Sequence, residues 1–349
     1  MKNLIVVMLT SIFAFTACNP TNEYAFKSSY SNPTIAGLIE ANQKLLTQYP
    51  TKAATATRAK GKRKGLTQME FTYVTMHDYL GAASGIGAVH GVAVGLGFAT
   101  GGTGYFATCG ICGAFCAAGY SWKAYRDLKG GYTSKVKVPS DGPLFITAKN
   151  AFLDSYDSIK INTSNDKAYK ELISKINLPE KYAYLKDVGE NHNGILKLTL
   201  ANINETSTRS VGLGGLNGGP IIGGNIPPAK PGTWLPSKTN SFKDIETIVK
   251  SNNLKDTYNL EMTKEFTKDY NKFIDENFNS TNVKEALKLY ANIYQRFPAN
   301  NNAIIATVNE YIRNIESHND FNSEEKEIIY GALIVSLYSP QLWKEIENL

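Results

Sequence analysis

The chain has 349 residues, of which 42% are hydrophobic and 19% are charged, and its formal net charge is +6. This composition is typical of a folded globular protein of about two domains and excludes a largely disordered chain. The positive charge is mild and spread along the sequence, so it does not indicate nucleic-acid binding, and we expect no nucleic-acid partner.

The N-terminus has the pattern of an export signal. Lys2 supplies a positive charge, Leu4 to Phe15 is apolar, and small residues then lead directly into Cys18. This arrangement resembles the bacterial lipobox and predicts a lipoprotein signal peptide over residues 1–17, with Cys18 as the lipidated mature N-terminus. Its acyl chains would hold the protein on a membrane. The alternative is an ordinary secretory signal that leaves Cys18 free. The expected location is the bacterial cell envelope, lipid-anchored at the outer membrane.

Residues 18–65 are predicted to form a tether, one short helix and a basic linker. Apolar residues from Ile35 to Leu46 have helical spacing, and this helix should end before Tyr49. Residues 51–65 are polar and basic and show no apolar periodicity.

The most unusual stretch is Tyr79–Trp122, which has no Asp, Glu, Lys or Arg and contains twelve glycines. Its length is about twice what one membrane-spanning helix needs. A glycine-rich turn signal at 100–104 divides it into two segments, 79–99 and 105–122. The sequence therefore predicts a helical hairpin within residues 66–130.

The glycines of this hairpin recur at four-residue spacing. Such spacing places small residues on a flat strip where a second helix can approach closely. Glycine costs about 1 kcal/mol per helical position relative to alanine, so these helices should persist only when the strip is packed. The predicted helix-packing residues are Gly81, Gly85, Gly87, Gly91, Gly95, Gly97 and Gly101.

Two environments fit the hairpin. It could associate with or insert into a membrane, or assemble with copies of itself, and its marginal hydrophobicity would still allow export. Alternatively, it could be the buried centre of a soluble helical domain whose amphipathic helices cover it.

Three cysteines lie in the second arm of the hairpin, at Cys109, Cys112 and Cys116, on one face of a helix. No His or carboxylate lies at ligand spacing nearby in the sequence, so no metal site is expected. The pair Cys109 and Cys112 lacks the context of a redox motif, although an exported protein can form disulfides. We expect the three cysteines to act as small apolar residues in a packed seam between helices.

Two further polar residues accompany the hairpin. His90 is more typical of a hydrogen-bonded core histidine than of a ligand, and a pH-sensing role has nothing else to favour it. Asp78 is expected to be the N-cap of a helix that starts at Tyr79.

Residues 131–205 are predicted to form a small helical module, followed by a Gly/Pro linker over 206–240. The module contains His192 and Asn193 at the expected head of a helix. This pair could be catalytic, metal-binding or a cap, and the cap is favoured because no nucleophile or carboxylate partner is evident in the sequence.

Residues 241–349 show the 3.6-residue periodicity of amphipathic helices joined by short loops, the last of which should end before Pro340. Together with the hairpin, they predict an all-α protein with a helical bundle. No catalytic triad, zinc-protease motif or P-loop is present in the sequence. We therefore expect no enzyme activity, no catalytic residues and no cofactor.

The motif Val188-Gly189-x-x-His192-Asn193-x-x-Leu196 and the ending Tyr338-Ser339 followed by Trp343 resemble those of uncharacterised Bacteroidetes lipoproteins. The resemblance covers roughly residues 148–200 and 241–345, and several of those proteins also carry a Gly/Ala-rich hairpin. It implies an envelope location and a helical architecture, and it implies no particular chemistry.

The sequence thus predicts a bacterial envelope lipoprotein with a glycine-zipper-like hairpin that associates with a membrane or self-assembles. Its expected partners are membrane lipid, through Cys18 and the 79–122 hairpin, and further copies of the chain. The alternative is a non-enzymatic surface or periplasmic binding module in which the hairpin is a buried core.

Overall fold

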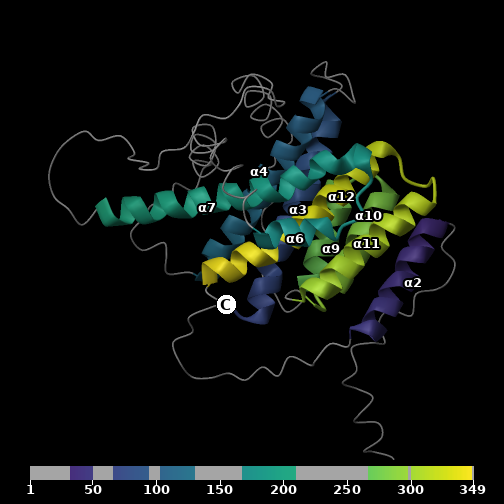
Figure 1. Cartoon of the computed structure of the whole chain (residues 1–349), viewed down its shortest axis with the longest axis horizontal. Helices are drawn as coiled ribbons and strands as arrows, with labels where there is room; N and C mark the ends of the chain where they lie inside the picture. The colour runs from purple at the N-terminus through teal and green to yellow at the C-terminus, as the bar shows by residue number, and fades with distance from the viewer. Residues whose placement is uncertain are drawn as a thin grey trace, which may run out of the picture.

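The computed structural model describes residues 32–49, 66–93, 103–129, 167–209, 266–297 and 300–347. Within these ranges every regular element is a helix, so the all-α prediction is confirmed, with a central glycine-rich hairpin and a helical bundle (Figure 1). The α-helices are α2 (Pro33–Gln48), α3 (Gln68–Ala93), α4 (Thr103–Lys129), α6 (Lys167–Ser174), α7 (Lys186–Arg209), α9 (Phe266–Asn277), α10 (Thr281–Tyr294), α11 (Asn301–Ser317) and α12 (Ser323–Glu347). A 3₁₀ helix, η3 (Glu180–Leu185), leads into α7.

Several predicted segments lie outside the described residues. These are the signal peptide with Cys18, the basic linker, the hairpin connection, and the stretch from 131 to 166. The predicted Gly/Pro linker also lies outside them, apart from its first residues, which continue α7 to Arg209. The bundle helices predicted before Phe266 also lie outside the described residues.

The hairpin consists of α3 and α4, and both arms are longer than predicted. Helix α3 starts at Gln68 because Thr67 and Glu70 form a capping box: the Thr67 N–H donates to Glu70 Oε2 at 2.7 Å and the Glu70 N–H to Thr67 Oγ1 at 3.2 Å. Asp78 therefore lies inside the helix, and its prediction as an N-cap was wrong.

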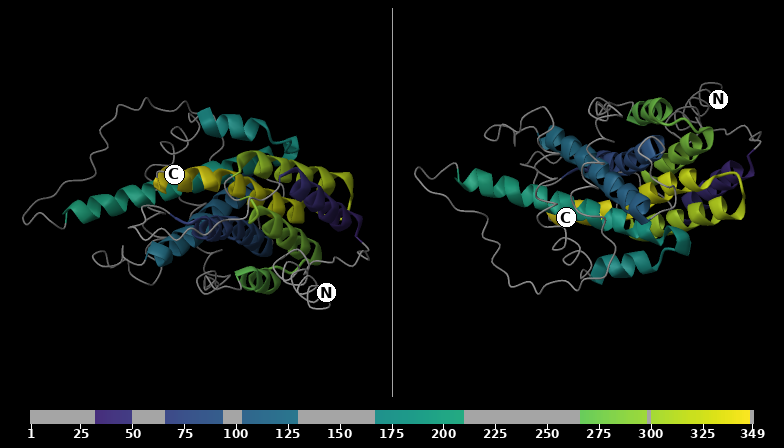
Figure 2. Two further views of the ribbon diagram at one scale, coloured as in Figure 1. Left: turned by 90° about the horizontal axis from the view of Figure 1, so that it is seen from below. Right: turned by 90° about the horizontal axis from the view of Figure 1, so that it is seen from above.

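The hairpin is covered by other helices of the same chain. Helix α12 packs along α3, and α7 packs against both α4 and α12, so that these four helices share one core (Figures 1 and 2). Val74, Leu80 and Ile86 of α3 and Phe115 of α4 are buried in it. None of the described helices is both long enough and apolar enough to cross a membrane.

Helices α2, α10 and α11 form a second layer, in which α2 packs on α10 and α11. Both α10 and α11 contact α12 (Figure 2). The short helix α2 agrees with its prediction. Asn42 anchors it by donating from Nδ2 to the Leu289 carbonyl at 3.0 Å and by accepting from the Tyr311 hydroxyl at 3.1 Å. Polar groups thus specify how α2 lies on an otherwise apolar surface.

Helix α12 continues through Pro340, so the prediction that it ends before this proline was wrong. A proline inside a helix costs about 3 kcal/mol. The residues after it compensate because Leu342 and Trp343 are fully buried and the Trp343 indole donates to Asp78 Oδ2 at 2.7 Å.

Candidate functional site

Helices α3 and α4 approach each other closely at two of the predicted packing glycines. A Cβ atom on Gly81 would lie 2.7 Å from the Ala117 Cα, and one on Gly85 would lie 2.5 Å from the Cys112 carbonyl oxygen. These backbones can be neighbours only because both positions lack a side chain. Gly81 and Gly85 therefore set the distance between the two arms.

The remaining predicted glycines have other surroundings. A Cβ on Gly87 would meet Ile328 Cδ1 of α12 at 3.6 Å, which is an ordinary contact. Gly91 belongs to the last turn of α3. Gly95, Gly97 and Gly101 lie outside the described residues. The strip thus faces two different partners, α4 near its start and α12 further along.

The three cysteines of α4 are buried and are not joined by disulfides. Cys112 and Cys116 lie in the seam beside Gly85. The hydrogen bond between Cys112 and Cys116, together with burial, raises the pKa of the Cys112 thiol well above its ordinary value. A thiol in this state is a packing residue and a poor nucleophile.

A buried polar network surrounds Asp78 in the middle of α3. Asp78 Oδ1 lies 2.5 Å from His192 Nε2, and Oδ2 accepts from Ser339 Oγ at 2.5 Å and from Trp343 Nε1 at 2.7 Å. The side chains of Asp78 and His192 are both 0% exposed. One carboxylate therefore ties α3 to α7 and to α12.

The other side of the His192 ring contacts Asn193. Asn193 Nδ2 donates to the Tyr338 carbonyl at 3.3 Å and to the Tyr169 hydroxyl at 2.8 Å, which fixes the orientation of the amide. His192 Nδ1 consequently faces Asn193 Oδ1, at 2.8 Å. Both ring nitrogens therefore have a hydrogen-bond partner, Asp78 on one side and Asn193 on the other. Asp78 and His192 thus form a buried hydrogen-bonded pair.

This network has the residue types of a catalytic triad without its geometry. The Ser339 hydroxyl donates to the carboxylate and not to His192, and both ring nitrogens are already bonded. A general base needs a nitrogen free to accept a proton from the nucleophile. The cap prediction for His192 and Asn193 was also wrong, because α7 begins at Lys186. Their role is to join helices.

A second cluster lies where the last turn of α3 meets α4 and α12. It contains His90, Cys109 and Glu327, whose potential ligand atoms all lie within 4.8 Å of one another. His90 Nε2 is 3.3 Å from Glu327 Oε2, and both side chains are only 6% exposed. Burial lowers the pKa of His90 to about 4, so the ring is neutral at physiological pH. The three residues come from three helices, and the spacing of residues in the sequence gives no sign that they meet.

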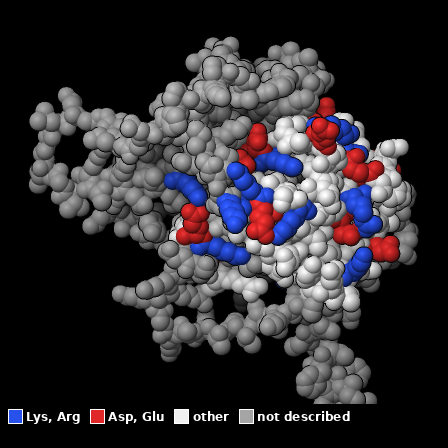
Figure 3. Space-filling view, in the orientation of Figure 1, with Lys and Arg blue, Asp and Glu red and all other residues white. Residues whose placement is uncertain are grey.

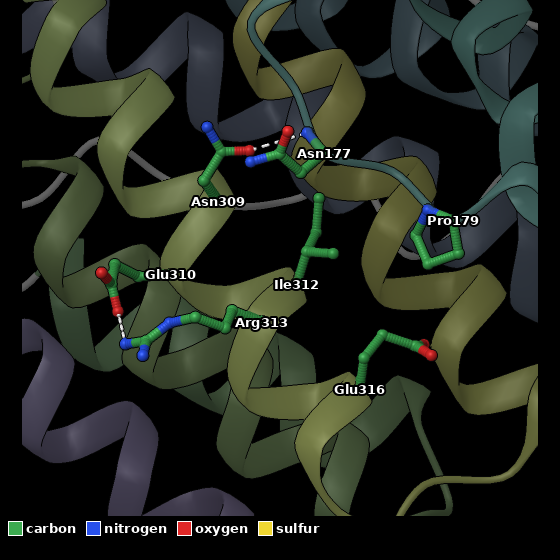
Figure 4. A pocket seen from close by; sticks show the side chains of 7 residues that line it. All are labelled: Asn177, Pro179, Asn309, Glu310, Ile312, Arg313 and Glu316. Carbon is green, nitrogen blue, oxygen red and sulfur yellow. Dashed lines mark hydrogen bonds and ion pairs between the residues drawn. The ribbon is translucent and has the colours of Figure 1, made fainter.

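A surface groove of about 490 Å³ runs along α11 beside the segment that links α6 to η3 (Figure 4). The Asn309 side chain holds that segment in place: Oδ1 accepts from the Asn177 N–H at 2.9 Å and Nδ2 donates to the Lys175 carbonyl at 2.8 Å. Arg313 pairs with Glu310 at one side of the groove. The lining is mixed in charge and includes two apolar side chains, Ile312 and Pro179.

The face shown in Figure 3 carries Lys and Arg interspersed with Asp and Glu. Charges of one sign do not gather on it into a stripe of the kind that binds a phosphate backbone. This face agrees with the mild net charge of the sequence.

The chain matches no protein-family model, no curated protein and no solved structure. Its function is therefore inferred from its own buried clusters and surfaces.

Proposed function

We propose that this chain is a lipid-anchored protein of the bacterial envelope that acts as a non-enzymatic binding module, with the glycine-rich hairpin as the core of its helical domain. Cys18 is the proposed attachment point to the membrane. The contact surface for a partner is the groove along α11.

The observation that carries this proposal is the burial of the hairpin within its own chain. Gly81 and Gly85 are in contact with the α4 backbone, and Gly87 faces α12. The described part of the strip, from Gly81 to Gly87, thus packs against helices of its own chain and is not exposed to a second copy or to lipid. The hairpin is thus the apolar centre of the domain. Amphipathic helices bury their apolar faces against such a centre.

The buried polar groups support a non-enzymatic role. His192 and Ser339 are 0% exposed, so a substrate cannot reach them in this conformation. Their hydrogen bonds are used to join α3, α7 and α12. A fully satisfied polar network of this kind specifies one arrangement of helices.

Membrane insertion of the hairpin is the second candidate, and the absence of charged residues from Tyr79–Trp122 favours it. Insertion would separate α3 from α7 and α12. It would break the Asp78–His192 pair and take Asp78 to the edge of the bilayer with its partners lost. Leaving one member of a buried pair alone costs about 3–5 kcal/mol, so the closed domain is the favoured state.

Membrane fractionation separates the two candidates. The mature chain without its lipid, residues 19–349, is mixed with anionic vesicles and tested for dye release and for resistance to alkaline extraction. We expect soluble protein and no leakage. Leakage by the unmodified chain would overturn the binding-module proposal and support insertion. A Gly85→Leu chain, in which the seam is forced apart, is the matched test of whether an opened hairpin becomes membrane-active.

The anchor and the groove need separate tests. Cys18→Ala should move the protein from the membrane fraction to the soluble fraction and abolish incorporation of labelled palmitate. A photo-crosslinking residue at Arg313, in the groove, should yield a discrete adduct in intact cells. The same residue at Lys272, whose side chain is 73% exposed on α9, should not. Equal labelling at both positions would reject the groove as the contact surface.

A further inference from the structure

The geometry points to a zinc-class metal site formed by His90, Cys109 and Glu327, where the metal would join the turn end of the hairpin to α12. This site is independent of the proposed binding role. It rests on the positions of three side chains from three helices, at the end of α3, near the start of α4 and near the start of α12.

The donor set decides which metals fit. It offers one imidazole nitrogen, one thiol sulfur and one carboxylate oxygen. Zn²⁺ accepts all three types, with bonds of about 2.0–2.3 Å. Mg²⁺ and Ca²⁺ require oxygen ligands and do not bind a thiolate well. The cluster should therefore discriminate strongly between zinc-like ions and the hard divalent cations.

The distances are close to those of a coordination sphere. Ligand atoms around tetrahedral Zn²⁺ lie about 3.3–3.8 Å from one another. His90 Nε2 and Glu327 Oε2 are already 3.3 Å apart, and all three potential ligand atoms lie within 4.8 Å. A side-chain adjustment of about 1 Å at Cys109 would complete three ligands, and water would supply the fourth.

Burial adds a physical reason for a cation at this place. Cys109 is 0% exposed and Glu327 is 5% exposed, and the residues next to the cluster in sequence, such as Val89 and Ile328, are buried and apolar. Removing a carboxylate from water is costly unless a cation or strong donors replace the water. A divalent ion would compensate Glu327 and would hold Cys109 as the thiolate, whose proton is released to solvent on binding.

The site would have a structural consequence. The connection between α3 and α4 lies between His90 and Cys109 in the sequence, and Glu327 belongs to the helix that covers the hairpin. A metal bound to all three would hold both arms and their cover together. Binding energy of this kind adds directly to folding energy.

The test uses the full-length chain purified in detergent without a histidine tag, stripped with chelator and equilibrated with Zn²⁺, Mg²⁺ or Ca²⁺. We expect one zinc per chain after dialysis, by elemental analysis, and no retained magnesium or calcium. Co²⁺ in place of Zn²⁺ should give a thiolate-to-metal charge-transfer absorption that Cys109→Ser abolishes.

Matched variants locate the metal. His90→Gln, Cys109→Ser and Glu327→Gln should each weaken zinc binding by more than about 100-fold, because even outer-shell partners account for 10- to 100-fold. The controls Cys112→Ser, His318→Gln and Glu324→Gln replace the same residue types on α4, after α11 and on α12 and should retain zinc. Far-UV circular dichroism checks that each variant is folded.

Three results would overturn the site. The folded wild-type chain could bind no stoichiometric zinc. The cluster variants and controls could bind it equally. The cobalt protein could lack the thiolate absorption. If Cys109→Ser fails to fold, zinc binding by His90→Gln and Glu327→Gln still tests the site, since both variants leave the cysteine in place.

Discussion

The middle of α3 and its C-terminal end both bury charged or titratable side chains, but they stabilise them differently. At Asp78, hydrogen-bond donors from α7 and α12 satisfy both carboxylate oxygens. About 18 Å further along the helix, His90 meets Cys109 and Glu327, a set of metal-ligand types. The first cluster is a hydrogen-bond network, whereas the second has the donor types of the proposed metal site. Helix α3 thus carries one cluster that joins helices and one that we propose binds a metal ion.

The largest expected effect comes from breaking the first cluster. Asp78→Asn removes the buried carboxylate that faces His192 and accepts from Ser339 and Trp343, so at least one of these partners loses its acceptor. We expect the free energy of unfolding to fall by about 3–5 kcal/mol, measured by urea denaturation with far-UV circular dichroism.

A surface aspartate provides the control for this substitution. Asp275 pairs with Lys288 and is 52% exposed, so Asp275→Asn should change the free energy of unfolding by no more than about 0.5 kcal/mol. If Asp78→Asn were equally mild, the network would not be a principal tie between α3, α7 and α12.

Metal removal is expected to produce the next largest effect and to separate the two clusters. At a free zinc concentration of 100 times Kd, binding should stabilise the wild-type chain by about 2.7 kcal/mol. Chelator should remove this increment in urea titrations of the wild type, and it should have no effect on Glu327→Gln. A Glu327→Gln chain that still loses stability with chelator would place the metal elsewhere.

Alanine substitutions at the two glycines between the clusters, Gly85 and Gly87, should change the free energy of unfolding in opposite directions. Gly85→Ala directs a methyl group at the α4 backbone, 2.5 Å from the Cys112 carbonyl oxygen. Such overpacking should lower the free energy of unfolding by about 1–3 kcal/mol. Gly87→Ala meets only ordinary contacts at 3.6 Å and beyond, and should instead gain up to about 1 kcal/mol from helix propensity. Equal thermal unfolding midpoints for the two variants would mean that the seam can open without cost.

Local sequence patterns were enough to predict the helices and the hairpin. Apolar spacing located α2, α10 and α11, and the turn signal at 100–104 predicted two successive helices, although α4 already begins at Thr103 within that signal. The residues at which helices start were harder to predict. The charge-free stretch begins at Tyr79, and this suggested Asp78 as a helix start, while the true start is fixed by Thr67 and Glu70 further upstream.

The candidate sites could not be predicted because their residues meet only in the tertiary structure. Asp78 and His192 are separated by 114 positions in the sequence, and no local pattern links them. Cys109 lacks a nearby ligand in the sequence, but the packing of α12 on the hairpin brings Glu327 to it. A buried Asp or Glu in an otherwise apolar helix face was the one available signal, since such a residue requires a partner.

The smallest expected effect concerns Glu316, which has Lys326 and Tyr330 as partners. Lys326 Nζ pairs with Glu316 at 3.0 Å, and the Tyr330 hydroxyl donates to Glu316 at 2.7 Å. Burial alone would raise the pKa of Glu316, but these hydrogen bonds bring it below its ordinary value of 4.5. The unfolded chain therefore binds this proton more readily than the folded chain. The resulting stability is fully present above pH 4.5 and is lost as the pH falls through the lower pKa of the folded state.

Tyr330→Phe should flatten this acid-side slope, because the folded pKa of Glu316 moves back toward its ordinary value. The difference should be about 0.5–1 kcal/mol, since Glu316 is 30% exposed and solvent screens its interactions. Urea titrations from pH 7 to pH 3 measure it. Tyr290→Phe is the control: its hydroxyl bonds Ser336 and no carboxylate, so its cost should be constant with pH. A pH-independent cost for Tyr330→Phe as well would mean that the lysines near Glu316, Lys326 and Lys181, and not the Tyr330 hydroxyl, keep its pKa low.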